Sequence, residues 1–160
     1  MPVQVTIRYD DLYRALEPLR GIKLRGSVQG KPLSKFPLRE LVEMLSNRYL
    51  GREEYRGHLV IGLRINASNK YVICHFGLEE PDDFCIGLEG ENVWERISQA
   101  ANELSKLIGE SYTLILSAIV HAIQGIISGE EEEVEEISDP DQVVEELLVW
   151  LPEYVQVVEK

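Results

Sequence analysis

The chain contains little cysteine, methionine, tryptophan or phenylalanine, and its longest apolar run is short. Two Cys among 160 residues are too few for the disulfide framework of a small secreted protein, so we expect Cys74 and Cys85 to be small core residues. Polar side chains interrupt the apolar run at residues 112–127, which predicts a buried helix and not a membrane span. The first residues show no basic leader or apolar signal core, and we therefore expect a cytoplasmic protein with no membrane contact.

Short motifs that identify catalytic or cofactor sites are also missing. The sequence contains no GxGxxG, GxxxxGK[ST] or GxSxG motif, and no pair of Cys or His residues has the spacing of a structural zinc site. We therefore expect a protein that is not an enzyme and that holds no cofactor and no metal. The low content of Met, Cys, Asn and Gln is compatible with a thermophilic source.

Charge is distributed very unevenly along the chain. The formal net charge is −12, yet residues 20–39 contain six Lys or Arg and neither Asp nor Glu. Residues 129–160 carry 12 acidic side chains and a single basic one, Lys160. The acidic character therefore belongs to the end of the chain, and the preceding 128 residues are nearly neutral.

Alternating and helical patterns predict an α+β fold with a four-stranded, mostly antiparallel sheet and about four helices. We expect the strands at residues 3–9, 58–65, 70–78 and 83–88, the middle two of which form a hairpin. Glycine and proline predict a loop for the basic stretch of residues 20–39. We expect helices near residues 10–19, 37–51, 92–109 (with Asn92 as its N-cap), 111–128 and 141–151.

Three regions follow from this pattern. Residues 1–128 form the predicted folded domain, residues 129–142 an acidic solvated linker, and residues 143–160 a C-terminal interaction segment. Val143, Val144 and Leu147 have no evident place in a domain already closed by residue 128, so this segment predicts self-association into a homo-oligomer.

The hairpin offers one candidate binding surface. If Leu59, Ile61, Leu63 and Ile65 face the helices, the opposite face presents Arg64, Tyr71 and His75, with Lys70 at the turn, as a platform on which unstacked bases can lie. An ordinary solvent face or an oligomer contact would present the same residue types.

Basic and aromatic side chains supply a second candidate surface. The segment at residues 48–57 interleaves Arg and Tyr, and together with the basic stretch it predicts a cleft that follows a phosphate backbone. A solvated helix end is the alternative interpretation. The predicted nucleic-acid-binding residues are Lys23, Arg25, Lys31, Lys35, Phe36, Arg39, Arg52, Tyr55, Arg56, Arg64, Lys70, Tyr71 and His75.

The order of the predicted elements and the basic N-terminal half resemble the DNA-binding domain of the ThermoDBP family, the archaeal single-stranded DNA-binding proteins and their related proteins. The resemblance covers roughly residues 3–128. It implies an aromatic cleft flanked by basic residues, and subunits joined through C-terminal elements. The local aromatic residues that match by position are Phe36, Tyr49, Tyr55, Tyr71 and Phe76.

We therefore predict a non-catalytic protein that binds single-stranded DNA or RNA as a homo-oligomer. The alternative is a protein–protein adaptor or assembly protein, whose apolar helices form interfaces and whose acidic tail contacts a protein partner or the protein's own basic stretch.

Overall fold

The computed structural model describes residues 4–29, 49–55, 57–65, 68–77, 83–126 and 135–159. Within these residues, four α-helices and eight β-strands form an α+β fold with two sheets. The predicted fold class is confirmed. The larger sheet has six strands, however, where four were expected.

The larger sheet is antiparallel throughout and has the strand order β3-β4-β5-β6-β2-β7. Its strands are β2 (Lys23–Gln29), β3 (Tyr49–Tyr55), β4 (His58–Arg64), β5 (Lys70–Phe76), β6 (Phe84–Glu89) and β7 (Glu135–Glu136). The predicted hairpin, now β4 and β5, is confirmed.

Two predictions about the basic half of the chain are wrong. Residues 23–29 form a strand where a loop was expected, and residues 49–51 begin a strand where the end of a helix was expected. Gly26 marks a bulge in β2, since the register of β2 with β6 shifts between Leu24 and Gly26. Glycine in this segment therefore bends a strand and does not indicate a loop.

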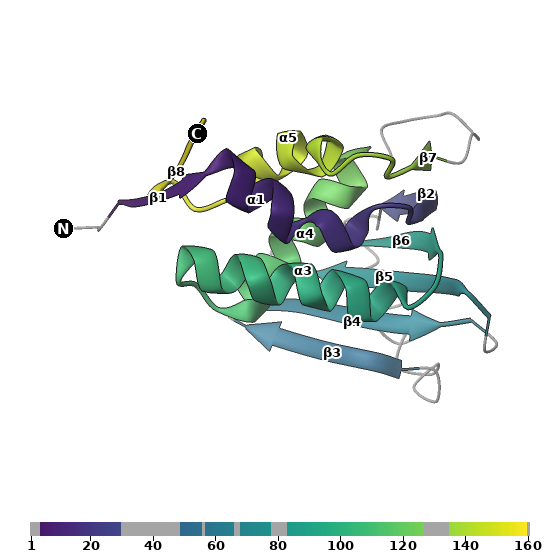
Figure 1. Cartoon of the computed structure of the whole chain (residues 1–160). Helices are drawn as coiled ribbons and strands as arrows, with labels where there is room; N and C mark the ends of the chain where they lie inside the picture. Colours follow the sequence, from purple (N-terminus) through teal and green to yellow (C-terminus); the bar gives the residue numbers. More distant parts are fainter. Residues whose placement is uncertain are drawn as a thin grey trace.

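The smaller sheet contains only β1 (Val5–Arg8) and β8 (Val155–Val158), which run parallel. The expectation that the first strand joins the main sheet is wrong. Figure 1 shows β1 and β8 at one end of the molecule, away from the six-stranded sheet. Val5 and Ile7 pair with Val155 and Val157, so the apolar side chains of β1 and β8 lie next to one another on one face of this sheet.

Helices α3 (Val93–Ile108) and α4 (Tyr112–Ile126) lie over one face of the larger sheet (Figure 1). The predicted apolar stripe of α3, from Trp94 to Ile108, is buried, and Gly109 ends this helix with a φ of 79°. Asn92 is the N-cap residue of α3, as predicted, but its side chain does not cap the helix. Asn92 has a φ of 52° and makes no side-chain cap hydrogen bond, because a capping side chain requires an extended backbone.

The remaining helices close the core on the side away from the sheet. Helix α1 (Tyr9–Ala15) and the short 3-10 helix η1 (Glu17–Leu19) pack near α3, and α5 (Asp141–Trp150) packs against α4. Val143, Val144 and Leu147 of α5 are fully buried in the same core. The expectation that these side chains have no place in the core is therefore wrong.

The two faces of the hairpin are the reverse of the prediction. Val60, Tyr71 and Ile73 belong to the main core below α3 and α4. Five side chains on the opposite face form a second buried cluster: Leu59, Ile61, Leu63, Cys74 and Phe76. Cys74 also forms a disulfide with Cys85, which corrects the expectation of two free core cysteines.

Candidate nucleic-acid interface

Lys23 and Lys70 lie in one row across the end of the larger sheet. Glu89 is the Cα partner of Lys70 on one side and of Lys23 on the other, and Lys23 also pairs with Glu136. Both lysines are exposed, and each precedes a residue of the main core, Leu24 or Tyr71. Because successive side chains of a strand point to opposite faces, this row lies on the face away from α3 and α4.

Arg25 joins the same row through an ion pair with Glu89. The bulge in β2 places the Cβ of Arg25 3.3 Å from the position that a Cβ on Gly87 would occupy, so the arginine stem lies over this glycine. The two side chains remain 45% and 27% exposed. An ion pair this exposed contributes little stability, and a phosphate can compete for the guanidinium.

Arg52 is exposed on the same face but at the edge strand β3. It pairs with Ile61, a member of the second buried cluster, and its nearest acidic partner is Glu54 at 3.5 Å. Four strand spacings across the sheet, combined with an offset of four residues along β4, place Arg52 about 23 Å from Lys23. The exposed basic residues thus lie around the margin of a buried apolar cluster.

Arg64 and Tyr71 occupy the other face. Tyr71 is 4% exposed, and the Arg64 guanidinium lies 5.9 Å from the centre of its ring while donating from Nε to the Ser68 carbonyl. The prediction that Tyr71 offers an open stacking surface is wrong, since α3 and α4 cover this face. Phe76, the aromatic residue implied by the resemblance on β5, is fully buried in the second cluster.

His75 is also fully buried and cannot meet a nucleobase, which corrects its predicted role. Its Nε2 lies 2.9 Å from Ser117 Oγ and 3.3 Å from His58 Nδ1, and its ring packs against His121 with 4.3 Å between the centroids. The ring of Trp150 also packs against His121, with 4.2 Å between the centroids. Among the described residues, no group of three or more His, Cys, Asp or Glu side chains is arranged to hold a metal.

The remaining predicted site residues lie outside what the structure describes. Tyr55 ends β3, but its side chain is not described. The others are Lys31, Lys35, Phe36, Arg39 and Arg56.

Comparison of the chain with models of known families, with curated proteins and with solved structures found no match. Within the described part of the chain, no single helix is long and apolar enough to cross a membrane. The pair α3 and α4 passes that test only when taken together, and the pair is bent by 119°.

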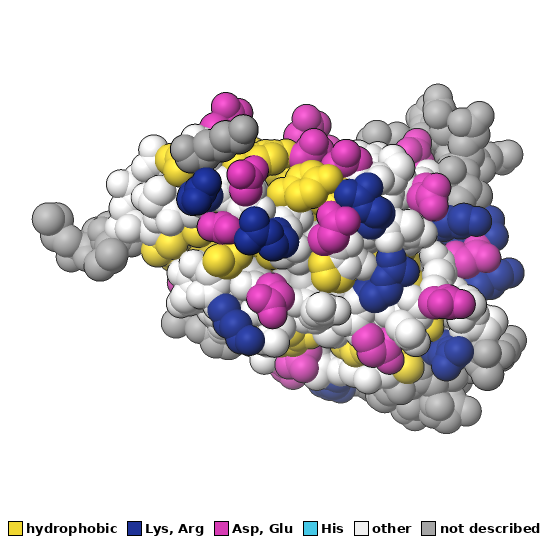
Figure 2. Space-filling model, viewed as in Figure 1, with side chains coloured by type: hydrophobic (Ala, Val, Ile, Leu, Met, Phe, Trp, Pro, Cys, Tyr) yellow, Lys and Arg dark blue, Asp and Glu magenta, His cyan; other side chains and the backbone are white. Residues whose placement is uncertain are grey.

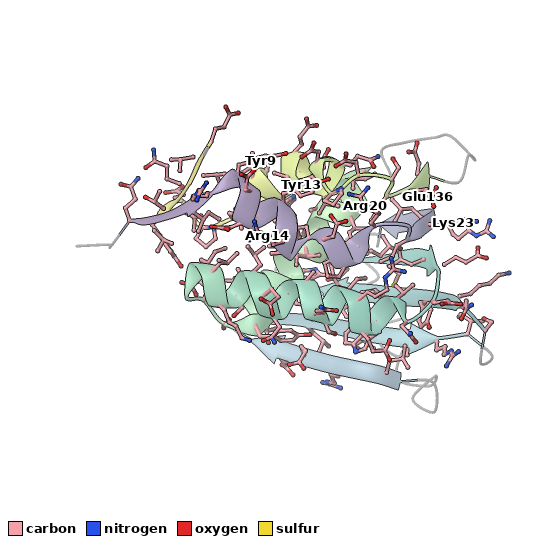
Figure 3. All side chains as sticks on the ribbon, in the orientation of Figure 1. Tyr9, Tyr13, Arg14, Arg20, Lys23 and Glu136 are labelled. Atoms are coloured by element: carbon pink, nitrogen blue, oxygen red, sulfur yellow. A yellow bond between two sulfur atoms is a disulfide. The ribbon has the colours of Figure 1, made fainter. Side chains whose placement is uncertain are left out.

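The acidic segment and the basic stretch meet at the edge of the sheet. Strand β7 pairs with Lys23 and Leu24, and the Ile137 that follows it is fully buried and exchanges backbone hydrogen bonds with Gly21 and Ile22. Figure 3 shows Lys23 and Glu136 side by side at this edge. The prediction of a solvated linker is therefore wrong for residues 135–142, the last two of which already belong to α5.

Arg20, which follows η1, also binds the acidic segment. Its Nη1 donates to the Ser138 carbonyl at 2.8 Å, and its other nitrogens donate to Glu17 and Tyr13 (Figure 3). The hydrogen bonds to Glu17 and Tyr13 raise the pKa of Arg20 above its ordinary value, so this cation stays charged at any physiological pH.

Sequence reasoning missed a groove of about 580 Å³ between β3, α3 and α4. Its lining consists of Leu50, Trp94, Glu95, Ser98, Gln99, Asn102 and Tyr112. Burial raises the pKa of Tyr112, whose hydroxyl also bonds with Ser98. Because the charged residue in this lining is Glu95, the groove does not suit a phosphate. The surface over α1 and α3 shows basic and acidic side chains interspersed (Figure 2).

Proposed function

We propose that this chain binds single-stranded nucleic acid, without catalysis, along the exposed basic margin of the sheet face opposite α3 and α4. The observation that carries the proposal is the common placement of Lys23, Arg25, Arg52 and Lys70, four of the predicted contacts, all exposed on this one face. Their spread of about 23 Å is long enough to follow several phosphates of an extended strand.

Binding of this kind depends on phosphate contacts and not on base recognition. Tyr71 and His75 are excluded as stacking residues by their burial. Lysine and arginine that neutralise phosphates release counterions, and this release supplies affinity without regard to sequence. We therefore expect little preference among oligonucleotide sequences.

Affinity for single strands should fall steeply with salt. Four to six phosphate contacts predict a log–log slope of about −3 to −4, so raising the salt from about 50 to about 200 mM should weaken binding about 60- to 250-fold. A titration of a fluorescent oligonucleotide at several salt concentrations, with a duplex as comparison, measures this slope. Binding that does not change with salt would contradict the proposal.

The acidic segment should compete with nucleic acid for this face. Strand β7 already places Glu136 beside Lys23, and a tethered anion acts at a high local concentration. Changing Glu130, Glu131, Glu132, Glu133, Glu135 and Glu136 to Gln should raise affinity about tenfold at low ionic strength, and less as screening increases.

A matched control separates local competition from a general charge effect. It changes the same number of exposed acids elsewhere to Gln, namely Glu91, Glu95, Glu103, Glu145, Glu153 and Glu159. Equal gains for the two variants would mean that the segment does not mask the face.

A protein–protein adaptor is the second candidate function. It is favoured by three consecutive side chains at the end of α5, Leu148, Val149 and Trp150, which are 48%, 76% and 45% exposed. Recovery of a defined complex by a chain that binds no oligonucleotide at about 50 mM salt would favour this function over the first.

A further inference from the structure

β1 and β8 form a sheet that is incomplete by itself. Each strand has four residues, and the sheet contains no third strand among the described residues. Parallel strands are found almost only inside larger, covered sheets, and an isolated pair of strands is marginally stable. Figure 1 shows the pair at the end of the molecule, where β8 lies apart from the six-stranded sheet.

The direction of the backbone groups identifies the open edge. The Val5 N–H donates to the Tyr154 carbonyl at 2.9 Å, so Tyr154 and every second residue after it turn their backbone groups toward β1. Val155 and Val157 therefore turn theirs to the outer edge. The Val155 N–H is satisfied by the Pro152 carbonyl at 3.0 Å, but no described strand receives the N–H and C=O of Val157.

β8 is short, but among the described residues its edge lacks the other features that keep edge strands apart. The sequence VQVV has no Lys, no Pro and no charge, and the pairing with β1 shows no bulge. Exposed Leu148, Val149 and Trp150 precede the strand by only a few residues. An apolar, unprotected edge beside an exposed apolar patch is the arrangement of an interface.

We propose that β8 pairs along its outer edge with β8 of a second copy of this chain, antiparallel and across a two-fold axis at Val157. The two Val157 residues then exchange both backbone hydrogen bonds, as directly opposed residues do in an antiparallel pair. The result is a four-stranded sheet in the order β1-β8-β8-β1. A second copy is the fitting partner because pairing across a two-fold axis occupies the open β8 edge of both copies at once and gives a closed dimer.

The interface is independent of nucleic-acid binding, since the proposed binding face lies on the other sheet. Dimerisation and nucleic-acid binding should respond to salt in opposite directions. Each copy carries a net charge of −12, so the two copies repel one another. Dimerisation should therefore strengthen as salt is added, whereas binding of nucleic acid should weaken.

Sedimentation velocity over a concentration series tests the proposal with three full-length proteins. The unaltered chain is expected to dimerise, and Val157→Pro, which removes the outward N–H, should weaken dimerisation about thirtyfold or more. Val157→Thr keeps the N–H and the β-branched shape, and should dimerise as the unaltered chain does. Among the described residues the Val157 N–H has no hydrogen-bond acceptor, and it points away from β1, so Val157→Pro should retain the β1–β8 pairing.

Hydrogen exchange of the unaltered chain provides a readout that does not depend on the folding of a variant. The Val157 amide should be protected at concentrations where the dimer forms and unprotected on dilution. A chain that is monomeric at about 100 µM would overturn the proposal, and so would a dimer whose Val157 amide exchanges freely or whose affinity is unchanged in Val157→Pro.

Discussion

Replacing Gly62 by Ala should lower the free energy of unfolding by about 3 kcal/mol, more than most single methyl additions. A Cβ at Gly62 would lie closer than 3.0 Å to the Trp94 ring, and a Cβ at Gly51, the cross-strand partner of Gly62, would do the same. The indole lies flat on these two glycines. Moving the ring away would break its other packing contacts, because Trp94 is 8% exposed and belongs to the main core.

Thermal or denaturant unfolding measures this cost, and two comparisons identify its cause. Gly109→Ala meets no atom within 4 Å but has a positive φ, so it reports the cost of backbone conformation alone, about 1 kcal/mol. In a Trp94→Leu background the clash is relieved, and Gly62→Ala should cost much less. Equal costs in the two backgrounds would show that the ring is not the obstacle.

The second large effect concerns the proposed binding face. Changing Lys23, Arg52 and Lys70 together to Gln should reduce single-strand affinity about a hundredfold at about 0.1 M salt and make the salt slope shallower by about 2. Each of the three side chains is exposed, so the fold should tolerate the changes. Fluorescence anisotropy at four salt concentrations gives both quantities.

A matched triple variant tests whether position or total charge matters. Arg8, Arg14 and Lys106 are also exposed, but they belong to β1, α1 and α3, away from the proposed face. Changing these three to Gln removes the same charge, and affinity should fall only severalfold through the loss of long-range attraction. If the two variants lose affinity equally, nucleic acid does not bind at the face that we propose.

Hydrophobic periodicity predicted the two long helices and the hairpin. The stripe of α3 and the continuous apolar character of α4 both correspond to helices in the structure. The hairpin was predictable because alternating residues extend along both strands and the connection is short. The last helix was also predictable in position, although its apolar residues pack within this chain.

The orientation of the hairpin was not predictable from alternation, because β4 is buried on both faces between its ends. When both faces are apolar, the pattern does not say which one meets the helices. Gly51 and Gly62 held the missing information, since glycine inside a strand often marks a close approach by another group. The binding roles assigned to Tyr71 and His75 failed as a direct result.

The sequence failed to predict strand β7 for a different reason. A run of glutamates opposes strand formation locally, and the sequence therefore predicted a solvated linker. In the structure, the burial of Ile137 and its two backbone hydrogen bonds with Gly21 and Ile22 hold the segment against β2. Such long-range contacts outweigh local propensity, and no local pattern reports them.

The pairing of β1 with β8 also constrains how the chain acquires its structure. Gln4 and Gln156, which are hydrogen-bonded across this pair, lie 152 positions apart in the sequence. During synthesis the first strand leaves the ribosome long before its partner exists, whereas β4 and β5 can pair as soon as both have emerged. The backbone edge of β1 that pairs with β8 therefore stays unpaired until residues 155–158 have been translated, and the joining of β1 and β8 is a late step in folding.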